Sequence, residues 1–399
     1  MTDSVAVLGV GMHPWGKWGR HFVQYGVKAA RDALADADVP WADIQFVAGA
    51  NTVRCGYPGY VSAATFSQAL GWNGARIASC YAACASGSQA LEAARTQILA
   101  GRADLALVVG ADTTPKGFLA PVKGERPDDP DWLRFRLFGA TNPAYFALHA
   151  RRRMARYGTT EEDIAAVRVK NGRHGLENPN ARYRKAFSLE EVLASPMVCD
   201  PLRLYEICAT SDGGAAVVLG SLEYARNRGL RPVTIEAIST ITPTFPSTQL
   251  ELPDMATDSA AAVAMPPMNF KPAVIEAAYQ EAGIGPEDIG VAEVYDLSTA
   301  MELDWYEALQ LCPEGEGHRL LREGATTIGG RVPVNPSGGL SCFGEAVPAQ
   351  ALAQVCELTW QLRGQAGVRQ VNNARYGITA NEGLFGHGSS VILKEGLGS

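Results

Sequence analysis

Cys84 is the side chain whose sequence setting most favours chemistry. It lies in the run YAACASGSQALEAA, directly before small residues that open an amphipathic helical pattern. A thiol at a helix N-terminus is exposed to the positive end of the helix dipole and to unpaired backbone N–H groups, which lower its pKa. We therefore predict a nucleophilic thiol of depressed pKa. The competing interpretation is a cysteine buried in the core.

Two further candidates lie in the C-terminal half of the chain. Tyr295 follows an apolar strand pattern in AEVYDLST, and Glu345 precedes a helical pattern in SCFGEAVPAQ. Burial can raise a glutamate pKa toward neutrality, where the carboxyl group acts as a base or an acid. A tyrosine of lowered pKa can remove a hydroxyl proton and return a proton to carbon. The alternatives are structural, with Glu345 capping its helix and the Tyr295 hydroxyl bonded to a core carbonyl.

The remaining candidates complete the predicted pocket. His387 lies among glycines in NEGLFGHGSS and is predicted to donate a hydrogen bond to a substrate carbonyl or to orient Glu345. Asp296 forms a tyrosine–aspartate pair with the residue before it. Glycines permit close approach of the backbone to a ligand. We predict substrate contacts for Asp296, Gly338, Gly339 and Gly386.

The elements that must position these residues alternate between short β-branched runs and longer helical patterns, which is typical of an α/β protein. The same order occurs twice. QALEAARTQILAG in the first half aligns with QALAQVCELTWQLRG in the second, and ALADADVPWADIQFV aligns with AAYQEAGIGPEDIGVAEV. We predict an internal duplication. The expected strands are 4–9, 43–50, 105–111, 232–240, 288–296 and 375–380, and the expected helices are 27–37, 86–100, 272–283 and 346–364.

The duplication relates the two best candidates to each other. Cys84 lies five residues before Gln89, and Glu345 lies five residues before Gln350, so both occupy corresponding turns before corresponding helices. A pseudo-two-fold axis that joins the two helix N-termini would create a positively polarised pocket, suited to an anionic intermediate.

Three motifs in the same order resemble the thiolase superfamily, and most closely its sterol-carrier-protein or lipid-transfer-type branch. They are CASGSQA, the strand-like DLALVVGAD at 104–112 and NPSGGL at 335–340. The resemblance spans nearly the whole chain and implies that Cys84 is the acyl-accepting nucleophile. It also implies an α/β thiolase-like fold of two duplicated αβαβα halves with a lid or loop-domain insertion. The expected divisions are an N-terminal half over 1–114, the insertion over 115–205, a return to the N-terminal half over 206–230 and a C-terminal half over 231–399.

The chain departs from the thiolase pattern at the catalytic histidines. Tyr295 stands where this branch carries the histidine of an HDxF-like segment, and Glu345 and Ala346 replace the histidine and proline of GHP. Both features resemble the steroid side-chain-cleaving aldolases, although Val347 stands where those enzymes carry a second tyrosine. The leading prediction is retro-aldol cleavage of a bulky, steroid-derived β-hydroxyacyl-CoA. The alternatives are a true thiolase or acyltransferase that uses Cys84, and a non-catalytic lipid or acyl-CoA transfer protein.

Composition excludes several other classes. The net charge of −7 over 399 residues argues against a general nucleic-acid surface, and no apolar run is long enough for a membrane span. The N-terminus lacks the basic region of a secretory signal, and eight cysteines without a CxxC pair predict free thiols in the cytoplasm and no metal site. GVG at 9–11 lacks the full dinucleotide signature. We expect no bound cofactor, with coenzyme A entering as part of the substrate.

The resemblance also implies partners. Thiolase-like enzymes dimerise through the strand and helix near the nucleophile, and IASCYAACASG offers a small-residue, apolar face for a homodimer. Members that lack the catalytic histidines work with a small OB-fold protein that carries a zinc ribbon, and we expect such a partner here.

Overall fold

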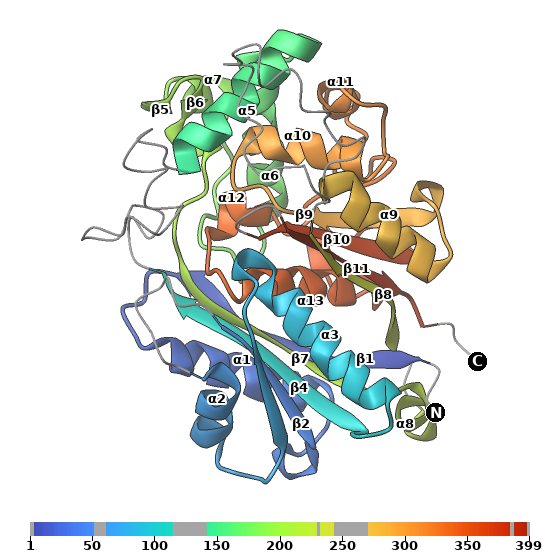
Figure 1. The fold of residues 1–399 in the computed structure, drawn as a ribbon. Coiled ribbons are helices and arrows are strands. Elements are labelled where there is room, and N and C mark those ends of the chain that lie inside the picture. Colours follow the sequence, from blue (N-terminus) through green and yellow to red (C-terminus); the bar gives the residue numbers. More distant parts are fainter. Residues whose placement is uncertain are drawn as a thin grey trace, which may run out of the picture.

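The computed structural model describes residues 4–51, 61–114, 142–229, 232–242, 270–383 and 387–396. Their strands form a nine-stranded sheet in the order β3-β2-β4-β7-β1-β8-β11-β10-β9 (Figure 1). The first five strands of this order come from the N-terminal half of the chain, and the other four come from the C-terminal half. The elements of the N-terminal half are β1 (Val5–Gly16), α1 (Phe22–Asp36), β2 (Phe46–Ala50), α2 (Ser62–Leu70), β3 (Arg76–Cys80), α3 (Ser86–Leu99), β4 (Leu105–Thr113), β7 (Asp212–Ser221) and α8 (Leu222–Asn227).

The second half repeats the pairing pattern of the first. In the first half β2 is parallel to β4, β4 is antiparallel to β7, and β7 is antiparallel to β1. In the second half β9 is parallel to β10, β10 is antiparallel to β11, and β11 is antiparallel to β8. The halves join where β1 and β8 pair antiparallel. The elements of the second half are β8 (Val233–Ile241), α9 (Phe270–Ala282), β9 (Ile289–Val294), α10 (Thr299–Ala308), α11 (Gly317–Arg322), α12 (Gly339–Phe343), α13 (Gln350–Leu362), β10 (Tyr376–Glu382) and β11 (Gly388–Lys394).

The helices and the two half-sheets together form five layers. Figure 1 shows α3 and α13 between the two half-sheets, α1 and α2 beyond the first half-sheet, and α9 and α10 on the outer side of the second. The central layer is sealed by apolar side chains such as Leu91 and Ile98 of α3 and Leu352 and Leu358 of α13. The predicted α/β fold and its duplication into two related halves are therefore confirmed.

Several element boundaries differ from the predictions for local reasons. The helix predicted over 346–364 begins at Gln350, because the Ala349 N–H donates to the Ala346 carbonyl in a separate turn. The strand predicted from residue 43 begins at Phe46, because residues 41–43 form a 3₁₀ turn. The pattern did not predict β7, a wholly buried strand between β4 and β1.

The described part of the predicted insertion is mostly helical. It contains α5 (Asn142–Tyr157), α6 (Glu161–Gly175), α7 (Leu189–Leu193) and the short strands β5 (Met197–Cys199) and β6 (Leu202–Arg203). Helix α6 packs against α10, α11 and α12 of the second half. The predicted division points of the chain stay predictions.

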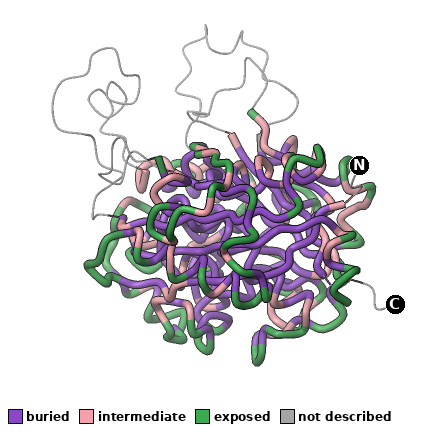
Figure 2. Tube along the Cα trace, turned by 90° about the horizontal axis from the view of Figure 1, so that it is seen from below, coloured by how far each residue is buried: buried purple, intermediate pink, exposed green. Residues whose placement is uncertain are grey.

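Figure 2 shows that the buried trace runs through the centre of the molecule while exposed segments lie at its periphery.

Among the described residues, no helix combines the length and the apolar character that a bilayer crossing requires.

Candidate active site

Cys84 lies on a tight turn between β3 and α3. The turn is a single 3₁₀ segment, Ala83–Ala85, in which Ala83 has a φ of 48°. This left-handed conformation is unfavourable for alanine and persists only where the surroundings hold it. Ser86 supplies that hold, because its hydroxyl accepts from the Ala82 N–H at 2.9 Å and donates to the Ala83 carbonyl at 2.6 Å. The thiol is consequently fixed and buried.

Glu345 lies in the corresponding turn of the second half, between α12 and α13. Its backbone N–H donates to the Ala209 carbonyl at 2.7 Å, and its carbonyl accepts from the Ser211 N–H at 2.8 Å. The preceding Gly344 has a φ of 73°, and a Cβ there would lie 2.4 Å from the Ser211 hydroxyl oxygen. A glycine is therefore required for this backbone to pass so close to the 209–211 segment.

The side chains of Cys84, Tyr295 and Glu345 meet in one buried cluster. The Cys84 thiol donates to Glu345 Oε1 with the two atoms 2.9 Å apart. Tyr295 directly follows β9, and its hydroxyl donates to the same oxygen at 3.2 Å. The other carboxylate oxygen, Glu345 Oε2, is buried and has no hydrogen-bond partner among the described residues. One carboxylate thus joins two donors and retains one oxygen for a further partner.

Burial controls the protonation of this cluster. It raises the pKa of Glu345 to about 7, although the hydrogen bonds from Cys84 and Tyr295 act in the opposite direction. Burial first, and then the Glu345 carboxylate, raise the pKa of the Cys84 thiol well above its usual value. Burial also raises the pKa of Tyr295 well above its usual value, and Cys84 and the Glu345 carboxylate add to the effect.

The predicted pKa depression of Cys84 is therefore wrong, and Tyr295 does not have the lowered pKa that would let it act as a base. A helix terminus carries only about half an elementary charge, whereas burial penalises the full charge of a thiolate or phenolate. The carboxylate of Glu345 adds repulsion to this penalty. Between the two helix starts lies the Glu345 carboxyl group with a pKa of about 7, and the positively polarised pocket stays a prediction.

His387 lies beside the turn that carries Cys84. Its Nε2 atom is 2.8 Å from the Ala82 carbonyl oxygen. The neighbouring Gly383 donates its N–H to the His387 carbonyl at 2.8 Å, and a Cβ on Gly383 would lie 2.0 Å from the imidazole ring. The ring nitrogen thus contacts the backbone of the Cys84 turn, and the predicted hydrogen bond to a substrate carbonyl stays a prediction.

Asp296, Gly338 and Gly339 serve the packing of α12. The Asp296 carboxylate accepts from the backbone N–H groups of Leu340 at 2.7 Å and Ser341 at 3.1 Å. A Cβ on Gly339 would lie 2.6 Å from that carboxylate, and one on Gly338 would lie 2.7 Å from the Cα of Gly175. Substrate contact by these three residues stays a prediction, and Gly386 lies outside the described residues.

Sequence reasoning missed Cys208. The Cys208 backbone N–H donates to the Leu297 carbonyl, and its side chain packs against the apolar cluster that contains Cys84 and Tyr295. Burial raises the pKa of the Cys208 thiol, and the charge of Glu345 adds to the effect. Nothing in the sequence around this cysteine indicates its place.

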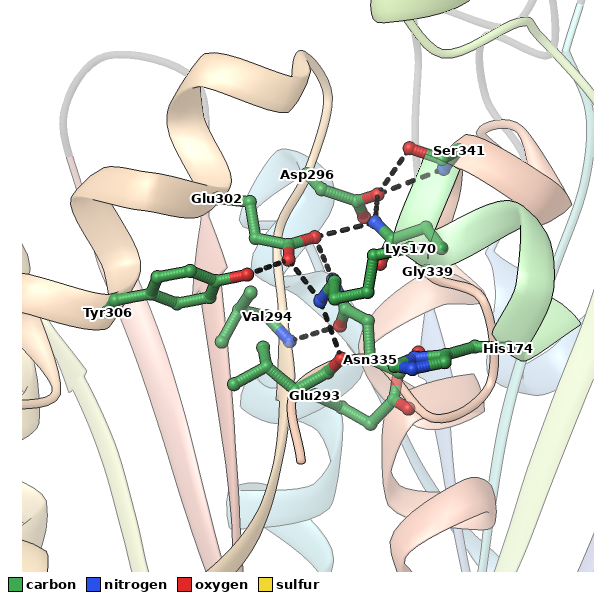
Figure 3. Close-up of polar contacts among 12 residues, drawn as sticks. Lys170, His174, Glu293, Val294, Asp296, Glu302, Tyr306, Asn335, Gly339 and Ser341 are labelled. Carbon is green, nitrogen blue, oxygen red and sulfur yellow. Dashed lines mark hydrogen bonds and ion pairs between the residues drawn. The ribbon is translucent and has the colours of Figure 1, made fainter. Parts of the chain in front are cut away.

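A buried polar network next to the cluster was missed as well (Figure 3). At its centre the Glu302 carboxylate accepts hydrogen bonds from Lys170, Asn171, Tyr306 and Asn335. Charged residues within otherwise buried helix faces are a usable sequence signal, because they require a partner. Lys170 in α6 and Glu302 in α10 both meet that description.

The cluster is suited to proton transfer. An acid–base group is most effective when its pKa lies near the working pH, and Glu345 meets that condition. Cys84 and Tyr295 are protonated, and either group, once it has given up its proton, can be reprotonated by the Glu345 carboxyl group.

Comparisons with known proteins agree with the fold. The thiolase N-terminal domain model matches residues 7–223, and the thiolase C-terminal domain-like model matches residues 255–395. Bovine sterol carrier protein 2 is 32% identical, with 100% of this chain and 73% of the relative covered. The acetyl-CoA acetyltransferase of Methanothermobacter thermautotrophicus is also 32% identical, with 98% and 99% covered.

Solved structures give the same result. The structure named Ltp2-ChsH2(DUF35) aldolase is similar with a TM-score of 0.81 at 25% identity, and 98% of each chain is covered. Human mitochondrial 3-ketoacyl-CoA thiolase has a TM-score of 0.71 at 16% identity, with 99% of each chain covered. The second likeness is one of fold alone.

Proposed function

For a chain that belongs to the thiolase family and is an enzyme of the lyase or acyltransferase type, we propose retro-aldol cleavage of a β-hydroxyacyl-CoA. The observation that carries this proposal is the shared Oε1 atom of Glu345, which accepts from both Tyr295 and Cys84 while Oε2 has no partner among the described residues. Retro-aldol cleavage needs a base for the substrate hydroxyl and a proton donor for the departing carbon. Glu345 and Tyr295 supply these two functions.

The proposed proton transfers form a complete cycle that returns Glu345 and Tyr295 to their starting states. Ionised Glu345 accepts the β-hydroxyl proton through Oε2, and the oxygen lone pair forms the carbonyl as the Cα–Cβ bond breaks. The bonding electrons pass to Cα as the thioester enolate. The Tyr295 hydroxyl protonates Cα, and Glu345 returns its proton to the Tyr295 oxygen. The products are an aldehyde or ketone and a shortened acyl-CoA, and no cysteine adduct forms.

The protonation states support this assignment over thiolysis. Thiolysis needs a thiolate, and both burial and the nearby carboxylate raise the pKa of the Cys84 thiol. Glu345 has a pKa of about 7 and is substantially ionised at neutral pH. His387 donates its Nε2–H to the Ala82 carbonyl that precedes the Cys84 turn, and it is proposed to exchange this hydrogen bond for one to the thioester oxygen.

The acyl group is proposed to be bulky and steroid-derived. Support comes from relatives named sterol carrier protein 2 and from the aldolase among the solved structures. We further propose that coenzyme A enters only as part of the substrate, that the chain binds no cofactor, and that it works in the cytoplasm.

A second candidate is acyl transfer through Cys84. The 2.9 Å contact from Cys84 Sγ to Glu345 Oε1 favours it, because Glu345 could accept the thiol proton. The acetyl-CoA acetyltransferase relative is consistent with such chemistry. A third candidate, transfer of lipid or acyl-CoA without turnover, is supported by the relatives named sterol carrier protein 2.

Two partners are proposed. The first is a second copy of the chain, because β3 is an edge strand of the described sheet and leaves Ile77 and the following Tyr81 about half exposed. The second is a small OB-fold protein with a zinc ribbon, which the DUF35 component in the name of the aldolase structure supports.

A direct assay separates the candidates. The protein is incubated with a β-hydroxyacyl-CoA in the absence of free coenzyme A, and release of an aldehyde or ketone is measured by mass spectrometry. Release supports the aldolase. If no aldehyde or ketone is released but Cys84 carries a thioester after incubation with acyl-CoA, the protein is an acyltransferase and not an aldolase. If acyl-CoA binds and neither product forms, the protein is a carrier.

A further inference from the structure

Both chain neighbours of Tyr295 are tied to one segment, residues 335–341. The Val294 N–H donates to Asn335 Oδ1 at 2.8 Å. On the other side, the Asp296 carboxylate accepts from the backbone at the start of α12. The same segment continues through α12 to Glu345. The distance between the Tyr295 hydroxyl and the Glu345 carboxylate therefore depends on how residues 335–341 are held against the end of β9.

Asn335 is the residue that makes this connection from both backbone and side chain. It is fully buried and has a φ of 53°. Its backbone N–H donates to the Ala292 carbonyl at 2.8 Å, and the preceding Val334 pairs with Ala292 in a parallel bridge. In the first half of the fold β3 pairs with β2 in the same parallel sense. Asn335 thus directly follows a single parallel bridge beside β9, which corresponds to the pairing of β3 with β2 in the first half.

The carboxamide of Asn335 is held at its other end by Glu302. Asn335 Nδ2 donates to Glu302 Oε2 at 2.8 Å. Figure 3 shows Glu302 between Tyr306, Lys170 and Asn335, with Asp296 and Ser341 on the neighbouring side. Lys170 also donates to the Val334 carbonyl at 2.8 Å, one residue before Asn335.

This anchor is rigid for an energetic reason. Glu302 and Lys170 are an ion pair with almost no exposed surface, and separating such a pair leaves an uncompensated buried charge. Glu302 also has three uncharged donors, each of which would lose its partner if the carboxylate rotated. The position of the Asn335 carboxamide is therefore set by groups that cannot move independently.

We propose that Asn335 is a positioning residue that keeps the Tyr295 hydroxyl within hydrogen-bond distance of Glu345, with Glu302 and Lys170 as its anchor. The inference rests on the proposed function, in which Tyr295 and Glu345 exchange a proton. Asn335 acts through the backbone at Val294.

The test is a double-mutant cycle on the protein without substrate. The titration of the Glu345 carboxyl is followed by infrared difference spectroscopy, and its band is assigned by its loss in Glu345→Gln. The hydrogen bond from Tyr295 lowers the pKa of Glu345, so Tyr295→Phe should raise it. Asn335→Gly, which suits a positive φ, should raise it in the same direction. The double variant should show no more than the larger single effect.

The proposal would be overturned if the two substitutions raised the Glu345 pKa additively, or if the Glu345 pKa of Asn335→Gly equalled that of the wild type. Asn335→Asp provides a second test if Asn335→Gly does not fold. Two neighbouring buried carboxyls cannot both ionise, so the new aspartic acid should donate to Glu302 and still accept from Val294. It should keep the wild-type pKa of Glu345, and a raised value would contradict our assignment.

A matched control separates positioning from general stability. Gln361 is also buried and forms hydrogen bonds with Glu357, Arg369 and Val371 near the far end of α13. Gln361→Ala should lower the melting temperature without changing the pKa of Glu345. A similar rise of that pKa in both variants would mean that loosening of the fold, and not positioning, is measured.

Kinetics give an independent reading. Asn335→Gly should lower kcat on a β-hydroxyacyl-CoA by about 10- to 100-fold with KM nearly unchanged, because a misplaced proton donor mainly affects the transition state. A wild-type protein without activity on such substrates would defeat the proposed function. The titration of Glu345 would still decide the role of Asn335.

Discussion

The Cys84 thiol lies 2.9 Å from the Glu345 carboxylate, although 261 residues separate them in the chain. Each residue occupies the turn before a central helix of its own half, α3 or α13. The pseudo-symmetry that relates the halves brings the two turns together. One copy of the duplicated turn carries a thiol, and the other carries a carboxyl group whose pKa burial raises to about 7.

Tyr295→Phe should lower kcat for retro-aldol cleavage by ~10²- to 10⁴-fold, the usual loss for one positioned acid–base group. KM should change little, because the ring keeps its volume. Steady-state kinetics check this prediction. Tyr279→Phe is the control, since the Tyr279 hydroxyl is also buried but donates to the Leu309 carbonyl. Equal activity of Tyr295→Phe and wild type would remove Tyr295 from the mechanism.

Cys84→Ala should retain most retro-aldol activity, because no acyl-enzyme forms on that path. Thiolysis of a β-ketoacyl-CoA should instead be abolished, because it requires the nucleophile. Both reactions are assayed with Cys84→Ala and with Cys356→Ala, a buried thiol bonded to backbone carbonyls away from Glu345. Complete inactivity of Cys84→Ala toward both substrates, with Cys356→Ala active, would sink the retro-aldol assignment.

The rate should rise with pH around the pKa of Glu345, which burial raises to about 7, because only the ionised carboxylate accepts the substrate proton. Rate profiles of kcat/KM from pH 5 to 9 measure this limb. Glu345→Gln should lose it together with most activity. A flat wild-type profile across neutrality would show that another group is the base.

The same pKa sets the sign of a stability effect. Glu345 has a pKa of about 7 in the folded protein against an ordinary 4.5, so the folded state binds the proton more tightly than the unfolded state. The resulting stabilisation is complete below pH 4.5 and is lost as the pH rises through about 7. Glu345→Gln, which never ionises, should gain stability relative to wild type above pH 7. Urea unfolding at pH 5 and pH 8.5 tests this, and equal differences at both pH values would refute it.

Gly344→Ala should disrupt the site. The new Cβ would lie 2.4 Å from Ser211 Oγ and 2.7 Å from the Ala209 carbonyl, so the Glu345 backbone must shift. Gly364→Ala is the control, because Gly364 also has a positive φ, of 69°, but nothing lies near its Cβ position. Both variants should lose about 1–2 kcal/mol from backbone strain, but only Gly344→Ala should lose more stability and most activity. Calorimetry and kinetics that do not distinguish the two variants would contradict this account.

Ile77→Asp should convert the proposed dimer to a monomer. Ile77 lies on the edge strand β3 and is 43% exposed, and a charge there opposes strand pairing between copies. Val368→Asp places the same charge at an exposed apolar residue outside the sheet and should leave the dimer intact. Analytical ultracentrifugation at micromolar concentration measures both. A fully active wild-type monomer would exclude the dimer.

The sequence by itself determined the fold class and the division of the fold into two related halves. The repeated strand and helix patterns predicted two related halves, and each half is observed with the same parallel and antiparallel pairings. Pattern and spacing also selected Cys84 and related Glu345 to it, whereas Tyr295 and Glu345 were first singled out by the resemblance to the thiolase superfamily, because they stand where that family carries histidines. Periodicity is a local property of the chain, so it can be read without knowing the fold.

The tertiary structure alone decided how those groups ionise and what supports them. The pKa values of Cys84 and Tyr295 are raised because burial and one distant carboxylate outweigh the helix terminus, and neither effect is local in sequence. Asp296 faces α12, although it is adjacent in the chain to Tyr295, because successive residues after a strand point to different neighbours. The role proposed for Asn335 likewise depends on contacts with Val294 and Glu302, which only folding brings within reach.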